Sequence, residues 1–281
     1  MSDEFVKVEN DEGVMVLTLH DPATRNAINP DMAQEFFEAL DRFEDDSELR
    51  VLLLTGSEPS FCSGANVRGF SSSIQAREER GESVSARPWG SMEARYSRRF
   101  DPESSHAPEM VLRLQEQQKP TIAAVNGHAI GAGMGLALAC DVRLASEKAI
   151  FSEAFVRMGL IPADGSCWNL PRLIGVSNTL LLQYTGDRVE GPEALRLGLV
   201  SQLVPDDRLM ESALGLAHRI AQGATRSQSL IKYLVRRAAD QSFREHLDLA
   251  HVAQDQARST EDHREAVQAF LDKRPPQFRG R

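Results

Sequence analysis

The chain has 281 residues, enough for one large domain or for a core with an appendage, and it can bury a substantial hydrophobic core. Its 41 acidic and 32 basic residues give a net charge of −9, which argues against nucleic-acid binding as its main role. Its three cysteines, Cys62, Cys140 and Cys167, show no metal-ligand spacing and no disulfide framework, which indicates a reducing compartment.

The N-terminal sequence MSDEFVKVENDEG is acidic and lacks the basic and apolar parts of a signal peptide. No apolar run reaches the roughly 18 residues that a membrane span requires. We therefore expect a cytoplasmic protein that does not engage a membrane.

Alternating and periodic apolar residues predict the first elements. Residues Val14 to Leu19 alternate as in a half-buried strand, and Val51 to Thr55 predicts a second strand. Between them, Asn29-Pro30 caps a helix expected over Asp31 to Phe43. The first half of the chain is thus predicted to mix strands and helices.

The middle of the chain repeats a strand, helix and strand over Thr121–Val125, Gly131–Ala139 and Val142–Ala145, which indicates an α/β fold. Before it, Ser71 to Pro108 is rich in charge and Ser with little periodicity, as in a long loop. From Asp206 onward helical patterns dominate, with a break at Gly223 and a stop at Pro275-Pro276.

The run TIAAVNGHAIGAGMGLALACD, from Thr121 to Asp141, leads an apolar strand through glycines into a helix of small residues. Glycines leave room for a ligand to approach the main chain. The first N–H groups of a helix have no partner within the helix and lie at the positive end of its dipole. This stretch therefore predicts a pocket for negative charge that is built from backbone.

Six segments resemble, in order, the crotonase superfamily, whose best-known members are enoyl-CoA hydratases and isomerases. They are HDPATRNAINPDM, FCSGANV, the Thr121 to Asp141 run, FVRMGLIPADGSCWNLPRLIG, GPEALRLGLVSQLV and TEDHREAVQAFLDKRPPQF. The resemblance implies a spiral of ββα turns in residues 1–205 that binds acyl-CoA. It also implies a C-terminal helical region, residues 206–281, for assembly into a homotrimer or a hexamer made of two trimers.

The resemblance assigns roles to the two glycine loops. Two backbone N–H groups, those of Ala65 and Ala132, are expected to stabilise the enolate oxygen of an acyl-CoA thioester. Coenzyme A is expected to bind along the loops that carry these positions. Arg25 is expected to contact a phosphate group of coenzyme A, and the other binding residues are expected to contribute mainly their backbone. The remaining positions are Ala27, Ser63, Ala65, Asn66, Val67, Gly131 and Ala132. Coenzyme A belongs to the substrate, and no metal or separate cofactor is expected.

The usual acids of the family's hydratases are missing. Those enzymes hold and activate water with two glutamates, and the corresponding positions here are Gly135 and Phe155, neither of which can transfer a proton. Several isomerases of the family use an acid at the position of Ala163, whereas this chain has Asp164 one residue later. Asp164 is the candidate general acid/base, with an Asx-turn or cap in the ADGS bend as the alternative. Glu153 is a second candidate, although strand alternation can direct it away from the pocket.

Residues 71–108 form a solvated loop or, alternatively, a lid that selects the acyl group. The predicted function is that of an acyl-CoA enzyme of the enoyl-CoA hydratase/isomerase type, with a role in fatty acid metabolism. Isomerase-like proton transfer is favoured over hydration. Other reactions that use the same oxyanion hole, such as thioester hydrolysis or decarboxylation, are alternatives. A further alternative is a non-catalytic acyl-CoA-binding or assembly protein.

Overall fold

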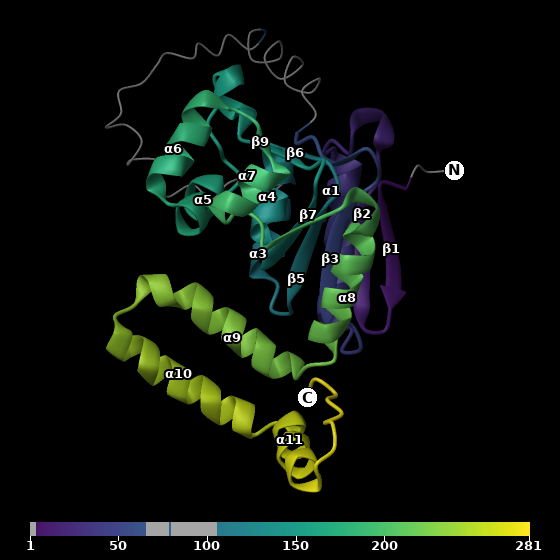
Figure 1. Cartoon of the computed structure of the whole chain (residues 1–281), viewed down its shortest axis with the longest axis vertical. Helices are drawn as coiled ribbons and strands as arrows, with labels where there is room; N and C mark the ends of the chain where they lie inside the picture. Colours follow the sequence, from purple (N-terminus) through teal and green to yellow (C-terminus); the bar gives the residue numbers. More distant parts are fainter. Residues whose placement is uncertain (1–3, 66–78, 80–105) are drawn as a thin grey trace.

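The computed structural model describes residues 4–65, 79 and 106–281. Two sheets form its core, one of six strands in the order β1-β2-β3-β5-β7-β10 and one of four strands in the order β4-β6-β8-β9 (Figure 1). The larger sheet comprises β1 (Val6–Asp11), β2 (Val14–Leu19), β3 (Val51–Gly56), β5 (Thr121–Val125), β7 (Val142–Ser146) and β10 (Gln202–Val204). The smaller comprises β4 (Ser60–Cys62), β6 (His128–Ile130), β8 (Ile150–Ser152) and β9 (Val189–Glu190).

The strands alternate between the two sheets along the chain, so that β3, β5 and β7 are each followed by a short strand of the smaller sheet. Pairing is parallel from β2 through β3, β5 and β7 to β10, and parallel among β4, β6 and β8. Only the outer pairs, β1 with β2 and β8 with β9, are antiparallel among the strands that the structure describes. This is the spiral of ββα turns that the sequence predicted.

Helices cover both faces of the larger sheet. The helices are α1 (Pro30–Asp45), α3 (His106–Glu116), α4 (Ala132–Ala139), α5 (Ser166–Ile174), α6 (Val176–Thr185), α7 (Gly191–Leu197) and α8 (Leu209–Ala221). On one face, α8 packs against β2, β3, β5 and β7. On the other, α1, α3 and α4 enclose the larger hydrophobic cluster. Because both faces are covered, β3 is buried along its whole length, which explains its continuous apolar run.

The chain ends in three helices, α9 (Thr225–Arg237), α10 (Phe243–Arg258) and α11 (Glu261–Asp272), which extend away from the core (Figure 1). Ser242 caps α10 and Thr260 caps α11 through their side chains. The break predicted at Gly223 separates α8 from α9, and α11 ends before Pro275-Pro276. Since α8 belongs to the sheet packing, the helices that leave the core begin at α9. None of the helices in the described part of the chain is long and apolar enough to cross a membrane.

Candidate active site

The N-terminus of α4 meets the loop after β4, which brings the two predicted donor segments together. A Cβ built on Gly64 would lie 2.6 Å from the carbonyl oxygen of Ile130 and 3.5 Å from the nitrogen of Ala132. Gly64 has a φ of 89°, a conformation that side chains disfavour. Only glycine therefore lets these two loops approach so closely.

The N–H groups of Ala65 and Ala132 are available to a ligand. Ala132 is the first residue of α4, and among the described residues neither nitrogen donates to an acceptor. The N–H of Gly131, in contrast, donates to the oxygen of Ser152 at 2.8 Å. Gly131 therefore shapes the loop, at a φ of 51°, while the N–H of the next residue remains for the substrate.

Phe155 and Asp164 also lie against the first turns of α4. A Cβ on Gly131 would lie 3.3 Å from the ring of Phe155, which forms a wall beside the first residue of α4. A Cβ on Gly135, one turn later, would lie 2.6 Å from Oδ2 and 2.9 Å from Cγ of Asp164. The carboxyl group of Asp164 thus occupies the space in which a side chain at position 135 would begin.

Asp164 is buried, at 3 % exposure, just before α5. Its Oδ1 accepts a hydrogen bond from the N–H of Ser166 at 3.1 Å, whereas Oδ2 has no partner within the described part of the chain. Burial raises the pKa of Asp164, and the neighbouring Ser166 partly offsets this effect. The Asx-turn predicted as its alternative role is present, but it uses only one of the two oxygens.

Glu153 lies in the same buried cluster. It follows β8 directly, is 1 % exposed, and neither carboxyl oxygen has a partner among residues that the structure describes. Burial raises its pKa to about 8, the nearby Asp164 carboxyl contributes in the same direction, and the Ser166 hydroxyl opposes both. Strand alternation does not decide the direction of this side chain, because β8 ends at Ser152 and Glu153 is the N-cap residue of the 3₁₀ helix η4 (Ala154–Met158).

The first loop carries the predicted coenzyme A positions. Arg25 is exposed, and its carbonyl oxygen accepts from the N–H of Ser63 at 3.0 Å. Ala27 is buried beside it. Asn66 and Val67, together with most of the 71–108 loop, lie outside the described residues. Asn26, which the sequence analysis did not single out, is fully buried and donates from Nδ2 to the oxygens of Ser57 and Ser60.

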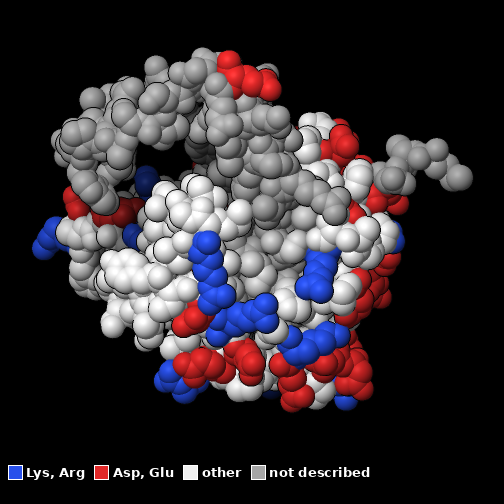
Figure 2. All heavy atoms as spheres, turned by 90° about the horizontal axis from the view of Figure 1, so that it is seen from above, with Lys and Arg blue, Asp and Glu red and all other residues white. Residues whose placement is uncertain are grey.

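Positive charge gathers near this loop. The pKa of His128 is lowered by burial and then by the positive charges of Arg25 and Arg188, both of which act on this ring. Arg188 lies just before β9 and had no sequence signal of its own. Seen from above, several basic side chains lie near the middle of the described surface, and acidic side chains lie around them, mostly toward the lower and right edges (Figure 2). The chain is acidic overall, so local basic groups matter for binding an anion.

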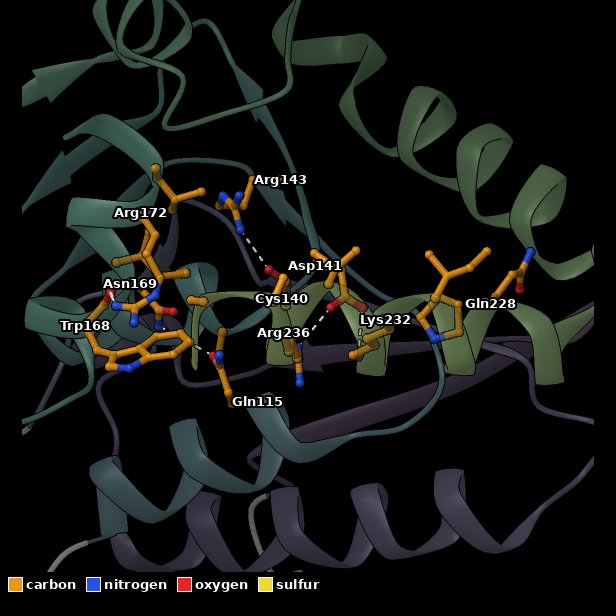
Figure 3. Close-up of a pocket in the computed structure, with 18 of the residues that line it drawn as sticks. Gln115, Cys140, Asp141, Arg143, Trp168, Asn169, Arg172, Gln228, Lys232 and Arg236 are labelled. Carbon is orange, nitrogen blue, oxygen red and sulfur yellow. Dashed lines mark hydrogen bonds and ion pairs between the residues drawn. The ribbon is translucent and has the colours of Figure 1, made fainter. Parts of the chain in front are cut away.

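A cavity of about 800 Å³ lies away from these groups, between α5, the end of α4 and α9 (Figure 3). Asp141 projects into it and accepts from the N–H of Thr121 while it pairs with Lys232 at 2.7 Å and Arg236 at 2.9 Å. Arg172 stacks on Trp168 at 3.7 Å. This network ties α9 to the core and contains neither predicted donor.

Comparison with known proteins gives the family. The family model for enoyl-CoA hydratase/isomerase matches residues 9–98 and 91–281. The chain belongs to the enoyl-CoA hydratase/isomerase family. It is therefore a member of the crotonase superfamily and an acyl-CoA enzyme of that family, as the sequence predicted.

Relatives span the whole length of the chain. The 1,2-epoxyphenylacetyl-CoA isomerase of Escherichia coli K12 is 36 % identical, over 99 % of both chains. The 2,3-dehydroadipyl-CoA hydratase of the same organism is 31 % identical, over 98 % of both. A solved structure of an enoyl-CoA hydratase/isomerase from Mycobacterium abscessus superposes with a TM-score of 0.86, at 30 % identity over 98 % of this chain and all of that one. Both isomerases and hydratases thus occur among the family's similar members.

Proposed function

We propose that this enzyme moves a proton between carbon atoms of an acyl-CoA thioester, as in double-bond isomerisation, with Asp164 as the general base. The observation that supports this proposal is the position of the Asp164 carboxyl against Gly135. Gly135 lies three residues beyond Ala132, where hydratases of the family carry an acid. A carboxyl group is therefore present near the second oxyanion donor, although it comes from a different part of the chain.

The proposed reaction balances without a redox partner. The thioester oxygen accepts hydrogen bonds from the N–H groups of Ala65 and Ala132. An oxygen of Asp164 takes a proton from Cα of a 3-enoyl thioester, and the electron pair of the C–H bond moves into the carbonyl to form a dienolate. Asp164 then returns the proton to Cγ, which leaves the conjugated 2-enoyl thioester. Only the positions of one proton and one double bond change.

The coenzyme A part of the substrate is proposed to lie along the first loop. Arg25 provides positive charge for a phosphate group, and Arg188 adds to it, since the charges of both arginines act on His128. The backbone of Ala27 and Ser63 lies next to Arg25 along the same path. Asn66 and Val67 remain predicted contacts.

Water addition is a second candidate, and a specific observation favours it. Three carboxyl oxygens, both of Glu153 and Oδ2 of Asp164, have no hydrogen-bond partner in the described part of the protein. Such oxygens can bind a water molecule, and several relatives carry the name hydratase. Thioester hydrolysis and decarboxylation would use the same donors.

The experiment is to assay the purified protein with a 3-enoyl-CoA and with crotonyl-CoA. The proposal predicts conversion of the 3-enoyl thioester to its 2-enoyl isomer at least 100-fold faster than hydration of crotonyl-CoA. Faster hydration would favour the second candidate. Binding of acyl-CoA with no turnover of either substrate would support the non-catalytic alternative.

We also propose assembly into a homotrimer through the C-terminal helices. Large apolar side chains are exposed on these helices, and together they form an apolar surface that is unfavourably exposed to water in a single chain. They are Ile231, Val235, Phe243, Leu247, Val252, Phe270 and Leu271. Size-exclusion chromatography with light scattering should give about three chain masses, or six for two stacked trimers, and a monomer would contradict this proposal.

A further inference from the structure

Cys62 is the last residue of β4 and lies where the two donor loops meet. It is fully buried, and it pairs with Ala129 of β6. A Cβ built on Gly133, in the first turn of α4, would overlap the carbonyl oxygen of Cys62 and lie 2.8 Å from its Cβ. The backbone of Cys62 therefore packs against the helical turn that carries the N–H of Ala132.

The side chain of Cys62 contacts the other donor loop. The N–H of Gly64 donates a buried hydrogen bond to Sγ of Cys62 at 3.4 Å. The carbonyl oxygen of Gly64 accepts from the N–H of Ile28 at 2.8 Å. Both polar groups of the Gly64 main chain are thus held by hydrogen bonds, one to the cysteine side chain and one to the first loop.

These two bonds orient the N–H of Ala65. The carbonyl of Gly64 and the N–H of Ala65 belong to one planar trans peptide unit, so they point in opposite directions. Ile28 holds the carbonyl side of this unit, and Sγ of Cys62 holds the N–H on the other side of the Gly64 Cα. The two bonds together hold Gly64 at its φ of 89° and thereby fix the direction of the next N–H.

We propose that Cys62 is a positioning residue that sets the distance and the direction of the two oxyanion donors relative to one another. This inference rests on the proposed function, in which the N–H groups of Ala65 and Ala132 bind the thioester oxygen. One residue serves both donors, because its sulfur holds Gly64 while its backbone packs against Gly133. Preorganised donors act most strongly on the charge that develops during the reaction, so loss of the sulfur should lower kcat more than it raises KM.

The thiol of Cys62 suits this position because it is neutral. Burial raises the pKa of Cys62 to about 12, and the hydrogen bond from Gly64 opposes this rise. A thiolate beside the oxyanion donors would repel the negative charge that forms on the thioester oxygen. A neutral sulfur accepts the N–H of Gly64 without this repulsion.

The first test measures kcat and KM for a 3-enoyl-CoA in the wild type, Cys62→Ala and Cys62→Ser. Alanine removes the acceptor for Gly64, and kcat should fall about 20-fold, less than the roughly 100- to 1,000-fold loss of a whole donor, with KM within about threefold. Serine restores an acceptor at a shorter bond length from Cβ, so its kcat should lie between those of Cys62→Ala and the wild type. An unchanged kcat in Cys62→Ala, or a serine variant no more active than the alanine variant, would overturn the proposal.

Cys140→Ala is the matched control. Cys140 is also a buried cysteine, but it caps the C-terminal end of α4, away from both donors. The substitution removes the same thiol group from the same protein core, and kcat should stay within about twofold of the wild type because neither donor moves. A loss as large as that of Cys62→Ala would contradict a specific role for Cys62.

The second test measures the donors without any turnover. Butyryl-CoA labelled with ¹³C at the thioester carbonyl is bound to each protein, and the carbonyl stretch is recorded by infrared difference spectroscopy. Hydrogen bonds from the two donors should lower this frequency in the wild type and in Cys140→Ala, and the lowering should be about half as large in Cys62→Ala. An equal lowering in the wild type and Cys62→Ala would overturn the proposal.

A measurement on the wild type alone serves if the Cys62 variants do not fold. In amide hydrogen exchange followed by NMR, the N–H of Gly64 should be protected in the free enzyme because it is bonded to sulfur. The N–H of Ala65 should gain protection only when butyryl-CoA binds. Equal exchange of the two amides in the free enzyme would contradict the inference.

The outcomes separate this inference from the proposed function. Butyryl-CoA has no double bond to move, so its carbonyl frequency tests the donors whether or not the enzyme isomerises. If the wild type isomerises no 3-enoyl-CoA but the carbonyl frequency depends on Cys62, the proposed reaction is wrong and the positioning role stands. If the wild type isomerises and Cys62→Ala keeps both its kcat and its carbonyl frequency, the positioning role is wrong and the proposed reaction stands.

Discussion

Around α4 and α5 two carboxyl groups are buried with oxygens that lack a partner in the described structure, whereas α9 to α11 expose large apolar side chains. Glu153 and Asp164 bury three carboxyl oxygens without hydrogen bonds in the described structure. Phe243 and Phe270 expose 76 % and 83 % of their surface. Each arrangement costs the isolated chain stability, and we proposed above that the first serves a substrate and the second another chain.

The ion pairs of the protein also differ in how deeply they are buried. On α10 the exposed Arg258 pairs with Asp255 at 3.3 Å, a contact that contributes little to stability. At Asp141, by contrast, partly buried Lys232 and Arg236 converge with the backbone of Thr121 on one carboxylate. This site connects the two regions, so changes there should disturb the C-terminal helices without removing the oxyanion donors.

The largest expected effect is on catalysis. Asp164→Asn keeps the size of the side chain but removes the base, and it should lower kcat about 1,000-fold with little change in affinity for coenzyme A. Steady-state kinetics and calorimetric titration with an acyl-CoA measure the two quantities. The exposed Asp207→Asn is the control and should behave as wild type. A tenfold loss or less in Asp164→Asn would remove it from the mechanism.

The buried carboxyls should also make stability depend on pH. Because folding raises the pKa of Glu153 from 4.5 to about 8, its contribution to stability is fully present below pH 4.5 and is lost as pH rises to about 8. A shift of this size corresponds to roughly 5 kcal/mol. Thermal melting from pH 5 to pH 9 should show this decline, and Glu153→Gln should flatten it. Equal slopes for the two proteins would argue against a strongly raised pKa.

Asp141→Ala should destabilise the attachment of α9. Two cations would lose their carboxylate, and Lys232 is only 9 % exposed, so the free energy of unfolding should fall by about 3 kcal/mol. Urea unfolding measures this change. Asp255→Ala, on an exposed pair of α10, should cost less than 1 kcal/mol. Similar losses for both variants would mean that Asp141 does not anchor the helix.

A smaller effect is expected at Gly135. The added methyl group of Gly135→Ala would lie 2.6 Å from Oδ2 of Asp164 and would displace the carboxyl, so kcat should fall about 30-fold. Gly215→Ala on α8 is a matched control, because no atom lies within 4 Å of its added Cβ. It should retain full activity and gain slightly in stability. Wild-type turnover in Gly135→Ala would show that Asp164 need not occupy this space.

The sequence predicted the four central strands of the larger sheet, β2, β3, β5 and β7, because their apolar runs stand out from their surroundings, but it missed the outer strands β1 and β10. It predicted β2, β5 and β7 within a residue and placed the helix break at Gly223. The smaller sheet was missed because β4, β6 and β8 have three residues each and β9 has two, too few for a pattern. The family itself was visible only through motifs spread over the whole chain.

At the site, backbone donors could be predicted and side-chain neighbours could not. Ala65 and Ala132 follow glycines in recognisable motifs. That Asp164 fills the space in front of Gly135 depends on how the bend before α5 folds back on α4, which no local pattern encodes. The influence of Asp164 on Glu153, and of Arg25 and Arg188 on His128, likewise depends on how segments far apart in the chain come together. The roles assigned to these residues remain predictions.

The central claim is that Asp164 abstracts a proton from Cα of a thioester held by the two backbone donors. The most direct measurement is proton NMR of a 3-enoyl-CoA in D₂O with the wild type and with Asp164→Asn at equal concentration. The wild type should exchange the Cα protons for deuterium while it forms the 2-enoyl isomer, and Asp164→Asn should slow both processes about 1,000-fold. Exchange that proceeds equally fast in Asp164→Asn would contradict the claim.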